Sequence, residues 1–125
     1  MMLIFGHPKI PAPSFYRVEN KEQIVSTPPN SIVRFAFDFE ILRYCQENGI
    51  QVAVEIANVK EAVYANALQA SFLLCSLPLA KEVQKIAENY LFDAKVVAFI
   101  DERVIEKAIE AGIDGVFLTN QSRCD

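Results

Sequence analysis

The sequence predicts an α/β domain: a three-layer sandwich with a mostly parallel five-stranded sheet and an extra N-terminal strand or arm at one edge. From residue 32 onward, short apolar runs alternate with amphipathic stretches, which is the pattern of successive βα units. Most of the apolar runs carry Val, Ile, Leu or Phe at consecutive positions, as expected for strands that are covered on both faces. The length of 125 residues suits a single domain.

The element boundaries come from the apolar runs and from the residues that flank them. The predicted strands are residues 32–37, 51–56, 71–75, 95–100 and 115–118. The predicted helices cover about 39–48, 59–68, 77–91 and 102–111. Asp38 and Asn58 are suited to capping helix N-termini, and Gly49 and Gly112 are suited to the position after a helix ends.

The chain divides into three regions within one α/β domain of residues 1–125. Residues 1–31 contain most of the prolines and are interpreted as a short strand at 3–5 followed by an extended arm and a loop. Residues 32–120 form the βα core, and residues 121–125 form a C-terminal tail.

An alternative fold remains open at this stage. The passage from Ala111 to Leu118 resembles the helix-to-strand connections of (β/α)₈ barrels, and the strands recur at a spacing that suits half of such a barrel. A half-barrel-like unit has to cover its open sheet, so this alternative implies that the chain dimerises.

Composition excludes several classes of function. The net charge of −4 argues against nucleic-acid binding, and every long uncharged stretch is interrupted by polar residues or proline, so no membrane segment is expected. Three cysteines without a CxxC pair, together with a single histidine, predict neither a disulfide framework nor a zinc site. The glycines form no phosphate-binding motif, so no cofactor is expected. We expect a small, acidic, cytoplasmic protein.

Candidate site residues follow the strands, because ligands of parallel sheets bind at the carboxyl ends of the strands. Asp38, Glu55 and Asp101 are the candidate catalytic or metal-binding carboxylates, and together they could hold Mg²⁺, with His7 as an acid or base. The competing interpretation is that Asp38 and Asp101 only cap the helices that follow them.

Glu55 and Cys75 need separate consideration because both lie in apolar runs. A carboxylate inside a strand needs a partner, and we predict that Arg34 on a neighbouring strand pairs with Glu55. Cys75 precedes a predicted helix, where a thiolate would be stabilised, but its leucine neighbours favour a buried, inert thiol.

Two functions of different classes fit these observations. The first is a non-enzymatic binding or self-association module with a protein partner or a homodimer, and the aromatic and proline-rich segment 10–18 would mediate the contact. The alternative is a metal-dependent hydrolase or phosphoryl-transfer enzyme that uses the three carboxylates. The sequence favours the first and leaves open whether the protein is an enzyme.

Overall fold

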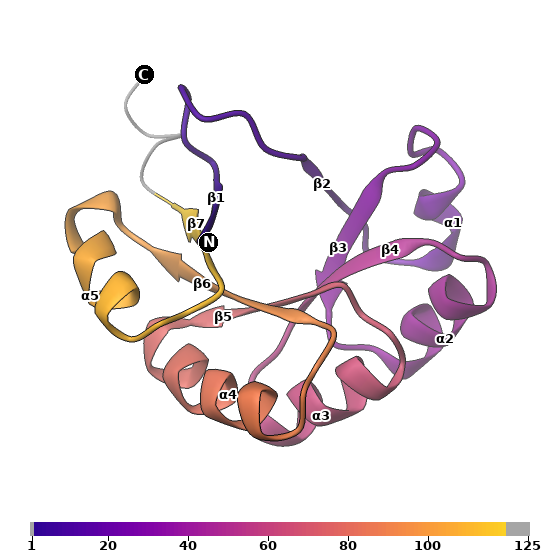
Figure 1. The fold of residues 1–125 in the computed structure, drawn as a ribbon. Helices are drawn as coiled ribbons and strands as arrows, with labels where there is room; N and C mark the ends of the chain where they lie inside the picture. The colour runs from indigo at the N-terminus through magenta and orange to yellow at the C-terminus, as the bar shows by residue number, and fades with distance from the viewer. Residues whose placement is uncertain (1, 120–125) are drawn as a thin grey trace.

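The computed structural model describes residues 2–119, which form one seven-stranded sheet flanked by helices (Figure 1). All neighbouring strands are parallel, in the order β1-β7-β6-β5-β4-β3-β2. The strands are β1 (Leu3–Phe5), β2 (Phe15–Arg17), β3 (Ile32–Ala36), β4 (Gln51–Glu55), β5 (Phe72–Ser76), β6 (Lys95–Ile100) and β7 (Gly115–Leu118).

The helices begin largely where the capping residues predict. They are α1 (Lys21–Ile24), α2 (Phe39–Glu47), α3 (Val59–Ala67), α4 (Leu77–Asn89), the 3₁₀ turn η1 (Glu102–Val104) and α5 (Ile105–Glu110). The Asp38 carboxylate accepts a hydrogen bond from the Ile41 amide at 3.1 Å, and the Asn58 side chain accepts one from the Glu61 amide at 2.9 Å. The predicted N-caps of α2 and α3 are therefore confirmed.

The two faces of the sheet are buried in different ways. The outer face packs against the helices, and the main core there includes Val33 and Phe35 from the sheet and Leu42 and Val83 from helices. The inner face carries a second cluster of side chains that all come from strands. Its buried members are Phe5, Ile32, Ala53, Leu74 and Val97, with Leu3, Phe15, Phe72, Phe99 and Phe117 packed against them.

Curvature of the sheet brings its two edges near each other. The rings of Phe5 on β1 and Phe15 on β2 are only 4.9 Å apart between centroids, although these strands lie at opposite ends of the strand order. In Figure 1 the segment between β1 and β2 crosses the open side of the sheet. The inner face thus covers itself with aromatic side chains, as the interior of a barrel does.

Two glycines allow β1 and β7 to approach each other closely. A Cβ at Gly115 would lie 2.9 Å from the Leu3 Cβ, and a Cβ at Gly6 would lie 2.9 Å from the Leu118 carbonyl oxygen. Gly6 also has a φ of +86°, which disfavours other residues. These positions let β1 dock against β7 at one edge of the sheet.

The α/β class and the parallel sheet are confirmed, but the sheet has seven strands rather than five, because the N-terminal strand at 3–5 joins it as edge strand β1 and part of the predicted arm joins it as β2. Every described α-helix buries side chains in the outer core, whereas the three-layer prediction placed helices on both faces. Both faces are covered, as the apolar runs indicated, but the inner cover is the sheet itself. The predicted tail, 121–125, lies outside the described residues, and among the described helices none is long and apolar enough to cross a membrane.

Candidate functional site

A cluster of three charged side chains lies at the carboxyl end of the sheet. Alternation along the strands places Arg17, Arg34 and Glu55 on the inner face, and the backbone register sets Arg17 beside Arg34. The Arg34 Nε donates to Glu55 Oε2 at 2.6 Å, and the Arg17 Nη1 donates to the same oxygen. The predicted partnership of Glu55 with Arg34 is confirmed, and Arg17 is an additional partner.

The electrostatic environment keeps Glu55 ionised. Burial alone would raise the pKa of Glu55, but the hydrogen bonds and charges of Arg34 and Arg17 outweigh that effect, so the pKa lies below its ordinary value. In turn, the hydrogen bond to Glu55 raises the pKa of Arg17. Arg17 also lies 3.5 Å from a carboxylate oxygen of Glu19, so it has two acidic partners, whereas Arg34 has Glu55 alone among the described residues.

Aromatic rings hold the Arg34 guanidinium from another direction. Its central carbon lies 4.8 Å from the centroid of the Phe99 ring and 5.4 Å from that of Phe117. Both distances are within the range of cation–π attraction. The two rings also contact each other, with centroids 5.5 Å apart. Arg34 is therefore fixed by an ion pair and by two ring contacts.

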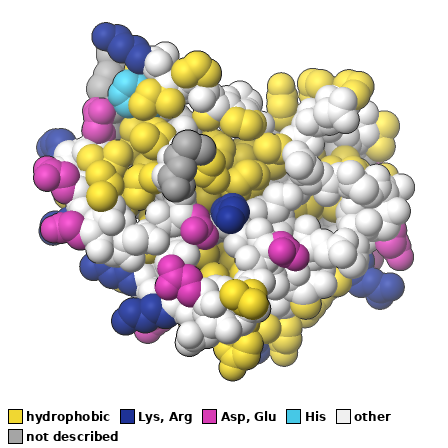
Figure 2. Space-filling view, in the orientation of Figure 1, with side chains coloured by type: hydrophobic (Ala, Val, Ile, Leu, Met, Phe, Trp, Pro, Cys, Tyr) yellow, Lys and Arg dark blue, Asp and Glu magenta, His cyan; other side chains and the backbone are white. Residues whose placement is uncertain are grey.

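A hollow opens beside this cluster, and we call it the mouth hollow. It has a volume of about 460 Å³, and the described residues that line it are Gly6, Pro8, Arg34, Phe99, Phe117, Leu118 and Thr119. Figure 2 shows apolar side chains gathered over the open side of the sheet, with charged side chains beside them. Its volume falls in the range of pockets that hold small organic ligands.

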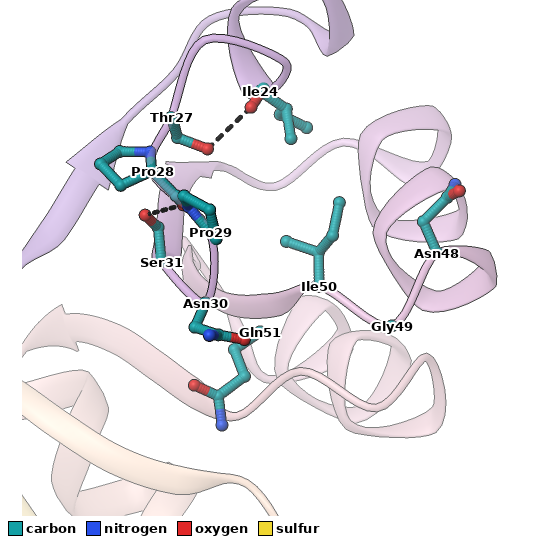
Figure 3. Close-up of a pocket in the computed structure, with 10 residues that line it drawn as sticks. All are labelled: Ile24, Thr27, Pro28, Pro29, Asn30, Ser31, Asn48, Gly49, Ile50 and Gln51. Atoms are coloured by element: carbon teal, nitrogen blue, oxygen red, sulfur yellow. Dashed lines mark hydrogen bonds between the residues drawn. The ribbon is translucent and has the colours of Figure 1, made fainter.

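A larger hollow, of about 670 Å³, lies at the opposite end of the sheet (Figure 3). Its described lining has no charged side chain and consists of residues from 24–31 and 48–51. Polar groups there bind their own loop: the Thr27 hydroxyl donates to the Ile24 carbonyl at 2.7 Å, and the Ser31 hydroxyl donates to the Pro28 carbonyl. Side chains at the amino-terminal end of parallel strands usually serve stability, so we assign the candidate site to the mouth hollow.

The other two candidate carboxylates have local structural partners. Asp38 caps α2, and Asp101 accepts hydrogen bonds from the Arg103 amide at 2.8 Å and from the Arg103 Nη2 at 2.7 Å. Within residues 2–119 the structure brings together no group of three or more His, Cys, Asp or Glu side chains that could hold a metal ion. The predicted Asp38–Glu55–Asp101 site therefore receives no geometric support.

His7 follows β1 and stands in the chain between Gly6 and Pro8, which both line the mouth hollow. Its Nδ1 accepts a hydrogen bond from the Lys9 amide at 3.0 Å, and its Nε2 lies 3.4 Å from a carboxylate oxygen of Glu102. Both ring nitrogens thus have a partner on the protein. These contacts connect the start of the N-terminal arm to the end of β6.

The thiols that the structure describes are buried. Cys75 is only 3% exposed, and burial raises its pKa to about 12. Burial likewise raises the pKa of Cys45 to about 11. Neither group is a thiolate at neutral pH, which supports the structural interpretation of Cys75 over the nucleophilic one.

Sequence reasoning did not include Arg17, Phe99 and Phe117 among the site residues. Arg17 belongs to a three-residue strand that was predicted as part of an arm, and the two phenylalanines were interpreted only as apolar strand residues. One signal was present: Phe15 and Arg17 are separated by a single residue, so a strand would place both on one face.

Comparisons with known proteins do not assign the chain to a family. No model of a known protein family matches it, and no curated protein matches it either. The proposals below therefore depend on the geometry of the site.

Proposed function

We propose that the protein is a non-enzymatic binding module that holds a small organic ligand in the mouth hollow. The observation that carries this proposal is the hollow itself, with apolar walls and a single ionic group, Arg34, among the described residues that line it. Binding pockets combine these elements: apolar surface supplies affinity, and a few fixed polar groups supply orientation.

The state of the acidic groups favours binding over catalysis. A general acid or base must exchange a proton near neutral pH. Glu55 is instead held ionised by two guanidinium groups, and Asp38 and Asp101 accept hydrogen bonds from backbone amides. The alternative of a metal-dependent hydrolase or phosphoryl-transfer enzyme would need these carboxylates to turn toward a shared ion.

Backbone amide shifts in a ¹H–¹⁵N NMR titration test the proposal. With benzyl alcohol, benzamide and benzoate as probes, we expect at least one to shift the amides of Gly6, Leu118 and Thr119. Phe99→Leu removes part of the wall of the hollow and should weaken the binding of that probe several-fold. Phe92→Leu is the matched control, because Phe92 packs against the outer core. Shifts confined to residues 24–31 and 48–51, or no shifts with any probe, would contradict the proposal.

Self-association is a second candidate function, and the open edges of the sheet favour it. β1 and β2 are the terminal strands of the sheet order among the described residues. Edge strands carry backbone groups that can pair with another strand. A second copy of this chain is the proposed partner of the β2 edge, because a two-fold axis would place the β2 edges of both copies side by side.

A cytoplasmic location is part of the proposal. The support for it is chemical: Cys45 and Cys75 are free, buried thiols in the structure, and free thiols suit a reducing compartment.

A further inference from the structure

We infer that the mouth hollow selects monocarboxylates, that is, ligands with one carboxylate group attached to an apolar body. This inference rests on the proposed function, since it names the chemical class of ligand for the same site. It is carried by the unused hydrogen-bonding groups of Arg34, by the positive charge of Arg34 and by the apolar walls beside it.

Arg34 retains donors after its contacts with the described residues are counted. Its Nε is used by Glu55, but no described residue accepts a hydrogen bond from its two terminal amino groups. A guanidinium presents its donors as a rigid fork that matches the two oxygens of a carboxylate. The Glu55 bond and the rings of Phe99 and Phe117 hold that fork in place beside the hollow.

The charged group that lines the hollow sets the charge of the ligand. Arg17 pairs with both Glu55 and Glu19, whereas Arg34 pairs with Glu55 alone and is the one charged side chain among the described residues that line the hollow. The hollow therefore presents a single guanidinium group, and one carboxylate matches it. A phosphate monoester carries nearly two negative charges at neutral pH, so it would leave a negative charge uncompensated beside Glu55.

The walls of the mouth hollow determine the polarity of the rest of the ligand, beyond its carboxylate. Apart from Arg34 and Thr119, the described lining side chains are apolar, and two of them are the aromatic rings of Phe99 and Phe117. Thr119 uses its hydroxyl to donate to the Ile100 carbonyl at 3.2 Å. An apolar body therefore fits against these walls better than a polyhydroxylated one, whose hydroxyl groups would lose water without gaining partners.

The test compares three probes that share a phenyl ring: benzoate, its neutral analogue benzamide, and phenyl phosphate. Dissociation constants from NMR titration of the full chain at neutral pH should be at least fivefold lower for benzoate than for benzamide, and phenyl phosphate should bind no more tightly than benzoate. Arg34→Gln should abolish the preference for benzoate over benzamide. Arg34→Lys should reduce it, because lysine keeps the charge but loses the fork.

Arg103→Gln is the matched control and should leave the preference unchanged, since Arg103 pairs with Asp101 and does not line the hollow. Equal binding of benzoate and benzamide in the hollow would overturn this inference and leave the proposed function standing. Tighter binding of phenyl phosphate would overturn it in favour of a phosphate ligand. If no probe binds, both the inference and the proposed function fail. If an Arg34 variant does not fold, the binding of the three probes to the wild type still decides whether this inference holds.

Discussion

At the scale of single residues, Glu55 shows how a charge is accommodated inside an apolar strand. Its carboxylate side chain is 23% exposed and would be costly to bury alone. Hydrogen bonds from Arg34 and Arg17 to one oxygen offset this cost; Arg34 comes from β3, which pairs with the strand of Glu55, and Arg17 comes from β2, the next strand beyond β3. Removing the Glu55 carboxylate therefore leaves the positive charges of Arg34 and Arg17 without the partner that they share.

Glu55→Gln should therefore lower the free energy of unfolding by about 1–3 kcal/mol at pH 7, since the amide cannot compensate two guanidinium groups. Urea denaturation of the purified variant measures this change. Glu19→Gln is the control: Glu19 also lies near Arg17, at 3.5 Å, but its side chain is 68% exposed. Loss of such a surface pair should change stability by less than about 1 kcal/mol. Equal losses in the two variants would contradict our account of Glu55.

Comparing the wild type with Glu55→Gln also gives a prediction for how stability depends on pH. The pKa of Glu55 is lower in the folded chain than its ordinary value, so the ionised form stabilises the fold. This contribution is complete above the ordinary pKa of a glutamate, about 4.3, and is lost as the pH falls through the lower folded value. The stability difference between wild type and Glu55→Gln should thus shrink as denaturation is measured at increasingly acidic pH. A difference that stays constant from neutral to strongly acidic pH would argue against the assignment.

At the scale of elements, the N-termini of α2 and α4 differ in how they are capped. Asp38 accepts a hydrogen bond from the third residue of α2, whereas Ser76 stands at the N-cap of α4 without a side-chain cap bond. The helix α4 has a proline in its first turn, which removes one of the amides that needs a partner.

Asp38→Ala should therefore cost about 1 kcal/mol of stability, because the Ile41 amide loses its acceptor. Ser76 also occupies an N-cap position, but its side chain makes no cap bond, so Ser76→Ala should lower the melting temperature much less. Melting temperatures of the two variants, measured side by side, check this prediction. A larger loss for Ser76→Ala would show that its hydroxyl has a role that the cap geometry does not explain.

The elements that the sequence predicted best are those with a local signal. Asp38 and Asn58 mark helix starts through hydrogen bonds that span three residues, and the runs that became β3 to β7 have apolar residues at most consecutive positions. β2 has no such signal, because it is three residues long and follows a segment with three prolines. Its pairing with β3 is decided by tertiary contacts, which a short segment does not reveal.

At the scale of the whole molecule, curvature of the sheet creates the candidate site. Glu55 and Arg34 could be paired from the sequence because their strands are consecutive in the predicted sheet. The mouth hollow could not be predicted, since it needs Gly6 and Pro8 after β1 to lie near Phe117 on β7. That contact joins opposite ends of the chain and depends on Gly115, where any side chain would collide with Leu3.

At the two ends of the described sheet lie the edge strands β1 and β2, and the proposed self-association would use the edge of β2. β2 ends the sheet, and Tyr16 at its centre is 41% exposed and points to the opposite face from Phe15 and Arg17. If the β2 edges of two copies pair across a two-fold axis, the two Tyr16 residues come close together. Tyr16→Lys would then place like charges near the axis, and lysine at an edge strand opposes pairing.

Sedimentation velocity from low to high micromolar concentration tests this arrangement. We expect the wild type to form a dimer as concentration rises and Tyr16→Lys to stay monomeric. Tyr90→Lys should dimerise like the wild type, because Tyr90 is 76% exposed after α4 and lies away from β2 in the chain and in the fold. A wild type that is monomeric throughout, or a dimer that Tyr16→Lys leaves intact, would exclude the β2 edge as the interface. The mouth hollow, which β2 does not line among the described residues, should bind its ligand equally well in either case.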